Sequence, residues 1–123
     1  MRNQTTTFKN LTVWKESHKL ALIIYKITHK FPRHEILGLT NQIRRASVSV
    51  PSNIAKGSAR TSKKERLKFL YIALGSLREI DSQSTLAKDL QYITPKEYQN
   101  LYQQINHVAK LLYGLIKKYQ KEI

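Results

Sequence analysis

In this chain of 123 residues, the lysines and arginines are the residues whose type and spacing most clearly suggest a function. A dense cluster of them lies in the middle of the chain, where Glu65 is the one acid among eight basic residues. The members are Arg44, Arg45, Lys56, Arg60, Lys63, Lys64, Arg66 and Lys68. Contacts of lysine and arginine with phosphates dominate the affinity of proteins for nucleic acids, so this density of cations favours a phosphate-bearing partner.

Two further sets of lysines fall on single faces of expected helices. At about 100° per residue, the first set shares roughly 60° of arc and the second roughly 40°. The sets are Lys15, Lys19, Lys26 and Lys30, and Lys110, Lys117 and Lys121. The stretch 60–68 also crosses an expected helix start, where free backbone N–H groups attract anions. This grouping favours nucleic acid as the partner of these lysines. The alternatives are a plain solvated surface and an acidic protein partner.

Signatures of catalysis are poor. The histidines form no metal-binding pair four residues apart, and no acid has a histidine three residues on, as a di-iron bundle site requires. The stretch Lys56-Gly57-Ser58 lacks the spacing of a phosphate-binding loop. We therefore expect no enzymatic activity, no cofactor and no metal.

A polar row on the second expected helix lies beside its apolar stripe. Gln42, Arg45, Ser49, Asn53 and Lys56 fall within roughly 100° of one another. Such a row is typical of a boundary between helices or between subunits. We interpret Gln42, Arg45, Ser49 and Asn53 as a network that fixes packing, with direct ligand binding as the alternative.

Aromatic side chains offer another way to hold nucleic acid, because unpaired bases stack on them. Most of the seven tyrosines lie on or beside apolar stripes, which predicts packing in the core or at an interface. We expect the same for Trp14. The tyrosines in this group are Tyr25, Tyr98, Tyr102, Tyr113 and Tyr119, whereas Tyr71 and Tyr92 are the better candidates for exposure.

Four amphipathic helices are expected to position these groups. Apolar residues recur at spacings of three and four, and the sequences Ser62-Lys63-Lys64-Glu65 and Thr94-Pro95-Lys96-Glu97 are typical helix starts. The pattern predicts one all-α domain over residues 1–123, an up-down-up-down four-helix bundle. The expected helices span residues 12–30, 35–56, 63–91 and 95–121.

Pro51 lies inside the second expected helix. Proline removes a backbone hydrogen bond, but the apolar stripe stays in phase across it. We therefore predict a kink near Pro51, with hydrogen bonds from Ser49 and Asn53 on the bent side. A short strand over Ser47–Val50 is the alternative.

The overall composition limits the class of protein. The net charge is +14, and there is no cysteine for a disulfide or a thiolate metal site. No apolar run has the length of a membrane helix, and the first ten residues lack the apolar segment of a secretory signal. We expect a cytoplasmic protein with no membrane partner.

The segment from Gly38 to Arg60, GLTNQIRRASVSVPSNIAKGSAR, closely resembles the signature of the 23S rRNA intervening sequence protein family, also called the four-helix-bundle protein family. Leu11-Thr12-Val13-Trp14, Phe31-Pro32 and Gly75-Ser76-Leu77 support the resemblance. Lys56 stands where family members usually have glutamate, so a pair between that glutamate and an arginine such as Arg45 would be missing.

The resemblance implies a four-helix bundle that assembles into a ring-like homopentamer without established enzymatic activity. Some members are encoded within insertions in large-subunit ribosomal RNA genes. The fold is also similar to that of the accessory protein of diversity-generating retroelements, a basic pentamer that binds nucleic acid and a reverse transcriptase. We therefore expect a homo-oligomer that binds nucleic acid, preferably RNA, with a scaffold for a reverse transcriptase or another protein as the alternative.

Overall fold

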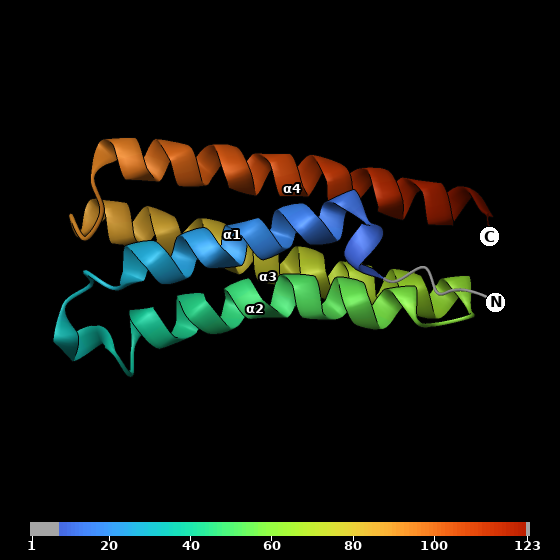
Figure 1. The fold of residues 1–123 in the computed structure, drawn as a ribbon, viewed down its shortest axis with the longest axis horizontal. Helices are drawn as coiled ribbons and strands as arrows, with labels where there is room; N and C mark the ends of the chain where they lie inside the picture. The colour runs from blue at the N-terminus through green and yellow to red at the C-terminus, as the bar shows by residue number, and fades with distance from the viewer. Residues whose placement is uncertain (1–7, 123) are drawn as a thin grey trace.

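Four antiparallel helices account for most of residues 8–122, the part of the chain that the computed structural model describes (Figure 1). Around the bundle, α1 packs against α2, α2 against α3, α3 against α4, and α4 against α1. No strand occurs among these residues, which confirms the predicted all-α bundle. The elements are the 3-10 turn η1 (Phe8–Asn10), α1 (Thr12–Thr28), the 3-10 turn η2 (Arg33–Glu35), α2 (Leu39–Ser58), α3 (Lys63–Asp89) and α4 (Pro95–Glu122).

The apolar stripes of all four helices meet in one core. Leu20, Ile43, Ile80 and Leu112, one from each helix, are completely buried. Because burying one such side chain contributes about 1.5–3 kcal/mol, this shared core is what holds the helices together.

Small polar residues lie between these apolar side chains. The hydroxyls of Ser17, Thr28, Ser47 and Ser84 are buried, yet each donates to a carbonyl three or four residues back in its own helix. The distances are 2.6–2.9 Å, as in ordinary hydrogen bonds. As donors, these four hydroxyls are therefore satisfied within their own helices.

The second helix begins at Leu39, and the predicted start at residue 35 is wrong. Glu35 ends the turn η2, and its Oε1 accepts a hydrogen bond from the backbone N–H of Leu39 at 3.0 Å. A Cβ on Gly38 would lie 2.7 Å from that oxygen, so glycine leaves room for the carboxylate. Glu35 therefore caps α2 from outside the helix, and Tyr92 donates to its Oε2 at 2.8 Å.

Pro51 lies within one continuous helix, so the alternative of a strand over Ser47–Val50 is wrong. Asn53 Nδ2 donates to the backbone oxygen of Ser49 at 2.8 Å and to its Oγ at 3.0 Å, as expected. Proline has no N–H to donate to the carbonyl of Ser47. The bend at Pro51 stays a prediction.

The predicted starts of α3 and α4 agree with the structure. Ser62 Oγ accepts a hydrogen bond from the backbone N–H of Glu65 at 3.3 Å. At the start of α4, the N–H of Glu97 donates to Thr94 Oγ1 at 3.1 Å, and the N–H of Thr94 donates to Glu97 Oε1 at 2.8 Å. The end of α3 was predicted two residues too late. Gln91 has a φ of 63°, and the N–H of Tyr92 returns to the carbonyl of Ala87, so a left-handed cap closes α3 at Asp89.

Candidate nucleic-acid interface

The start of α3 and the end of α4 lie side by side at one end of the bundle (Figure 1). The guanidinium of Arg66 lies 5.4 Å from the ring centroid of Tyr119, and Gln120 Nε2 donates to the hydroxyl of Tyr71 at 2.6 Å. Two basic stretches far apart in sequence are thereby joined, and their sequences contain the acids Glu65 and Glu122. We call this set the basic end: Arg60, Lys63, Lys64, Arg66, Lys68, Lys117, Lys118 and Lys121.

Some cations of the basic end also have structural contacts. Arg66 is half-buried and its Nε donates to the carbonyl of Arg60 at 2.7 Å. The guanidinium of Arg60 lies 4.8 Å from the ring centroid of Phe69, and Lys63 is half-buried. Lys64 and Lys68 are exposed, as are Lys117, Lys118 and Lys121 near the end of α4. These exposed lysines are the members best placed to contact a phosphate.

The lysine stripe of α1 is exposed over its first three members. Lys15 and Lys26 face solvent, and Lys19 Nζ lies 3.9 Å from Glu16 Oε1. Lys30 instead forms an ion pair and hydrogen bond with Glu97 at the start of α4. The stripe therefore offers fewer available cations than the sequence suggested.

The two candidate cations on α2 differ in their surroundings. Lys56 is exposed, whereas Arg44 is half-buried between α1 and α2. Arg44 Nε donates to Thr28 Oγ1 at 2.8 Å, and its guanidinium lies 5.0 Å from the ring centroid of Tyr25. Arg44 thus joins two helices, a role that its position in the basic cluster did not reveal.

Three carboxylates are engaged within the chain. A hydrogen bond from Gln104 lowers the pKa of Glu16, and the backbone N–H of Leu39 lowers the pKa of Glu35. A hydrogen bond from Lys30 lowers the pKa of Glu97. Glu35 lies in the connection between α1 and α2, and Glu97 lies in the first turn of α4; both elements are at the end opposite the basic end (Figure 1). At that end Glu97 is paired with Lys30 and offsets one of its cations.

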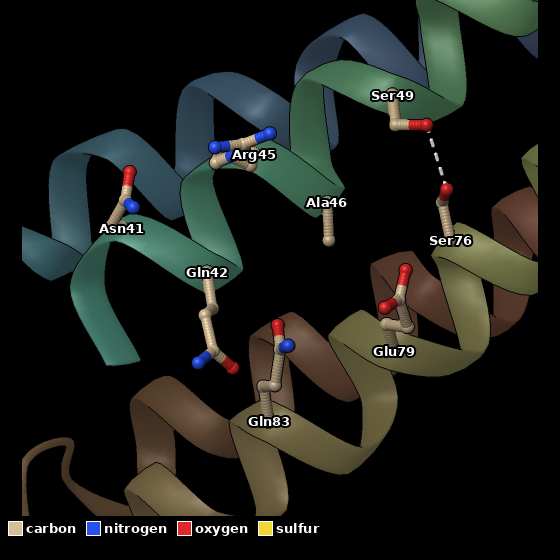
Figure 2. A pocket seen from close by; sticks show the side chains of 8 residues that line it. All are labelled: Asn41, Gln42, Arg45, Ala46, Ser49, Ser76, Glu79 and Gln83. Atoms are coloured by element: carbon tan, nitrogen blue, oxygen red, sulfur yellow. Dashed lines mark hydrogen bonds between the residues drawn. The ribbon is translucent and has the colours of Figure 1, made fainter. Parts of the chain in front are cut away.

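A polar cleft of about 400 Å³ lies along the boundary between α2 and α3, which pack against each other (Figure 2). Ser76 Oγ donates to Ser49 Oγ at 2.8 Å across it, and the side chains of Gln42 and Gln83 point toward one another. Gln83 Oε1 is buried without a hydrogen-bond partner among the described residues. The cleft is lined by Asn41, Gln42, Arg45, Ala46, Ser49, Ser76, Glu79 and Gln83.

The four residues expected to form a polar network divide into two pairs. Ser49 and Asn53 are hydrogen-bonded to one another, and Ser49 also bonds to Ser76. Within residues 8–122, the side chains of Gln42 and Arg45 make no such bond and line the cleft instead. Lys56 lies outside the cleft lining. The polar row therefore marks the α2–α3 boundary and leaves two of its members accessible.

The aromatic residues are more exposed than their sequence positions suggested. Tyr25, Tyr102 and Tyr113 are 42%, 39% and 46% exposed, so they do not lie in the core of this chain, and the alternative of packing at an interface stays a prediction for them. Tyr71 is exposed as predicted, whereas Tyr92 is half-buried against Glu35, whose hydrogen bond raises the pKa of the tyrosine.

Sequence reasoning missed one aromatic group on α1. Trp14 is half-buried, and the rings of Trp14 and His18 stack with centroids 4.8 Å apart. Tyr25 follows on the same side of the helix, and all three line one groove. Their spacings of four and seven residues would have grouped them as one helix face.

Two features are absent from the part of the chain that the structure describes. Residues 8–122 contain no group of three or more histidine or acidic side chains that could hold a metal ion. No helix there combines the length and apolar character needed to cross a membrane.

Comparison with known proteins identifies the family. The sequence profile of the 23S rRNA-intervening sequence protein family matches residues 9–114. A crystal structure of a protein of unknown function from the S23 ribosomal protein family of Bacteroides thetaiotaomicron superposes with a TM-score of 0.78 and 24% identity, over 85% of this chain and 95% of that one. This likeness shows the shared fold, and no curated protein matches the chain. The chain belongs to the 23S rRNA-intervening sequence protein family.

Proposed function

We propose that this protein is a non-catalytic homo-oligomer that binds RNA through phosphate contacts at the basic end. The observation that carries the proposal is the meeting of the first turns of α3 with the last turns of α4, which brings together two basic stretches whose sequences contain the acids Glu65 and Glu122. Lysines concentrated in this way attract a phosphate backbone more strongly than the same charges spread over the surface. RNA is the favoured nucleic acid because the family is described by an association with 23S rRNA.

The proposed oligomer is a homopentamer, as the family resemblance implies. The polar cleft supports an interface, because Gln83 Oε1 is buried without a partner among the described residues and Gln42 points toward it. A neighbouring copy could supply the missing donor, which would offset the cost of the unpaired oxygen. Sedimentation or light scattering should give five times 14.4 kDa. A monomeric mass at every concentration would contradict this assembly.

The RNA proposal is tested by a pair of variants matched in charge. Lys64→Ala with Lys68→Ala removes two exposed cations of the basic end. Arg33→Ala with Lys96→Ala removes two exposed cations from the opposite end. Each is titrated into a fluorescent RNA single strand at several salt concentrations, and anisotropy gives the affinity.

The expected effects follow from counterion release. Each phosphate contact contributes about −0.7 to the log–log salt slope of a single strand, hence about a fourfold change in affinity near 0.15 M salt. Removing Lys64 and Lys68 should weaken binding about 14-fold and flatten the slope by about 1.4, equally for different sequences. The control variant, Arg33→Ala with Lys96→Ala, should change both the affinity and the salt slope by less.

Two other results would redirect the proposal. Unchanged binding in the Lys64 and Lys68 variant would move the site to the lysine stripe of α1 around Lys15, Lys19 and Lys26. No binding of the native protein to any RNA or DNA at low salt would refute nucleic-acid binding and favour a scaffold for a protein partner such as a reverse transcriptase.

A further inference from the structure

An apolar groove of about 400 Å³ lies between α1 and α2, on the side of the bundle. It holds the most exposed apolar side chains of these two helices: Leu22 is 60% exposed and Val48 is 44% exposed. Exposed apolar patches of this kind mark interaction sites when polar groups surround them. The groove is lined chiefly by Trp14, His18, Leu22 and Tyr25 from α1 and by Val48 and Pro51 from α2.

Aromatic rings form much of one wall. Trp14 and His18 stack with an angle of 17° between their planes. The ring of Phe8 meets Trp14 edge-on, with the two ring centroids 5.3 Å apart. Tyr25 lies further along the same wall and is 42% exposed, with the guanidinium of Arg44 over its ring. The wall is therefore aromatic, with one face of Trp14 covered by His18 and one face of Tyr25 covered by Arg44.

Positive charge borders the groove on both helices. On α1, Leu22 lies three residues after Lys19 and four before Lys26, positions that are neighbours on a helix surface. On α2, Val48 lies four residues after Arg44, whose guanidinium lies over the ring of Tyr25 in the groove wall. Of the described residues that line the groove, none is acidic. The charge of the rim is complementary to a polyanion.

We propose that this groove binds unpaired bases of a single-stranded nucleic acid, whose phosphates contact the lysines of α1. Proteins that bind single strands combine a basic path for the backbone with aromatic rings on which bases stack. The volume suits a base-sized group, since pockets for small ligands span about 300–1,000 Å³. The groove runs from the end where α1 begins and α2 ends, which is also the basic end (Figure 1).

This inference rests on the proposed nucleic-acid function and adds a preference for single strands. A continuous duplex keeps its bases stacked inside the helix, so it can contact the lysines but cannot fill the groove. The predicted consequence is a difference between single-stranded and duplex ligands at the aromatic wall, in addition to the salt-dependent binding that both share.

Trp14 is the one tryptophan of the chain, so its fluorescence reports directly on the groove. The probes are oligouridylate, oligoadenylate and an RNA duplex of equal length. Saturable quenching of Trp14 by the single strands, with little quenching by the duplex, is the expected result. His18→Ala with Tyr25→Ala should weaken single-strand binding about tenfold or more and leave duplex binding within about twofold.

Tyr102→Ala is the matched control, because Tyr102 is a tyrosine of similar exposure on α4, outside both the groove and the basic end. Circular dichroism checks that each variant keeps its helices. In the control, the single strands should bind and should quench Trp14 fluorescence as they do in the native protein. An equal loss in the control and in the groove variant would overturn the assignment to the groove.

The failures of the two proposals can be told apart. Salt-dependent binding by anisotropy without any change in Trp14 emission, and without loss in the groove variant, would overturn the base site and leave the phosphate function standing. No binding at low salt would overturn both. Trp14 emission that follows protein concentration and mass would assign the groove to a second copy. Quenching by an acidic amphipathic peptide and by no oligonucleotide would assign it to a protein partner.

Discussion

Gly57 lies where α2 passes close to the start of α3, and replacing it with alanine tests that packing. The new Cβ would lie 3.2 Å from Phe69 Cβ and 3.4 Å from the backbone oxygen of Arg66. Alanine gains about 1 kcal/mol over glycine inside a helix, whereas crowding of a packed contact costs about 1–3 kcal/mol. Gly57→Ala should therefore destabilise the protein by about 1 kcal/mol.

Gly75 provides the opposite case on α3. A Cβ there would meet nothing within 4 Å, so Gly75→Ala should keep the full helix gain of about 1 kcal/mol. The two variants should then differ by about 2 kcal/mol, or about 1 M in urea midpoint for a slope of about 2 kcal/mol/M.

Urea unfolding followed by circular dichroism measures this difference at one protein concentration, because association changes apparent stability. A Gly57→Ala protein more stable than the native one would refute the close approach of α2 and α3. A destabilised Gly75→Ala protein would contradict the open surface at Gly75.

Three further predictions concern the core, the end of α3 and one carboxylate. Ile80→Ala removes a completely buried side chain and should cost about 2–5 kcal/mol in urea unfolding. Gln91→Gly relieves a left-handed residue and should raise stability by about 1 kcal/mol in the same assay, whereas Gln91→Ala should not. Glu97 has a pKa below its ordinary 4.5, so its ionised form stabilises the fold above that value, and the contribution is lost as pH falls through the lowered pKa. The melting temperature of Glu97→Gln should therefore lie below that of the native protein at neutral pH, and the gap should shrink in acid.

Local sequence signals predicted the helices well where the deciding groups are neighbours in sequence. The starts of α3 and α4 depend on Ser62 with Glu65 and on Thr94 with Glu97, each three residues apart. The start of α2 depends instead on Glu35, which stands outside the helix and is also bound by Tyr92 from the connection between α3 and α4. That second contact spans 57 residues, and no local pattern predicts it.

The candidate interface was predicted in its residue types but not in its arrangement. The sequence presented residues 60–68 and the lysines of α4 as separate groups, and only the packing of Arg66 on Tyr119 joins them. Helix periodicity also could not separate Lys68, which is free in solvent, from Arg44, which lies between α1 and α2. Exposure depends on the neighbouring helix, which the sequence of one helix does not contain.

The buried hydroxyls of Ser17, Thr28, Ser47 and Ser84 have a mechanical consequence. Each donates within its own helix, so a small displacement of one helix along its neighbour breaks none of these bonds. Small side chains also leave little to interlock at the points where they face another helix. Axial sliding in the bundle is therefore opposed by the fit of the large aliphatic side chains and by contacts nearer the surface, such as the bond from Ser76 to Ser49.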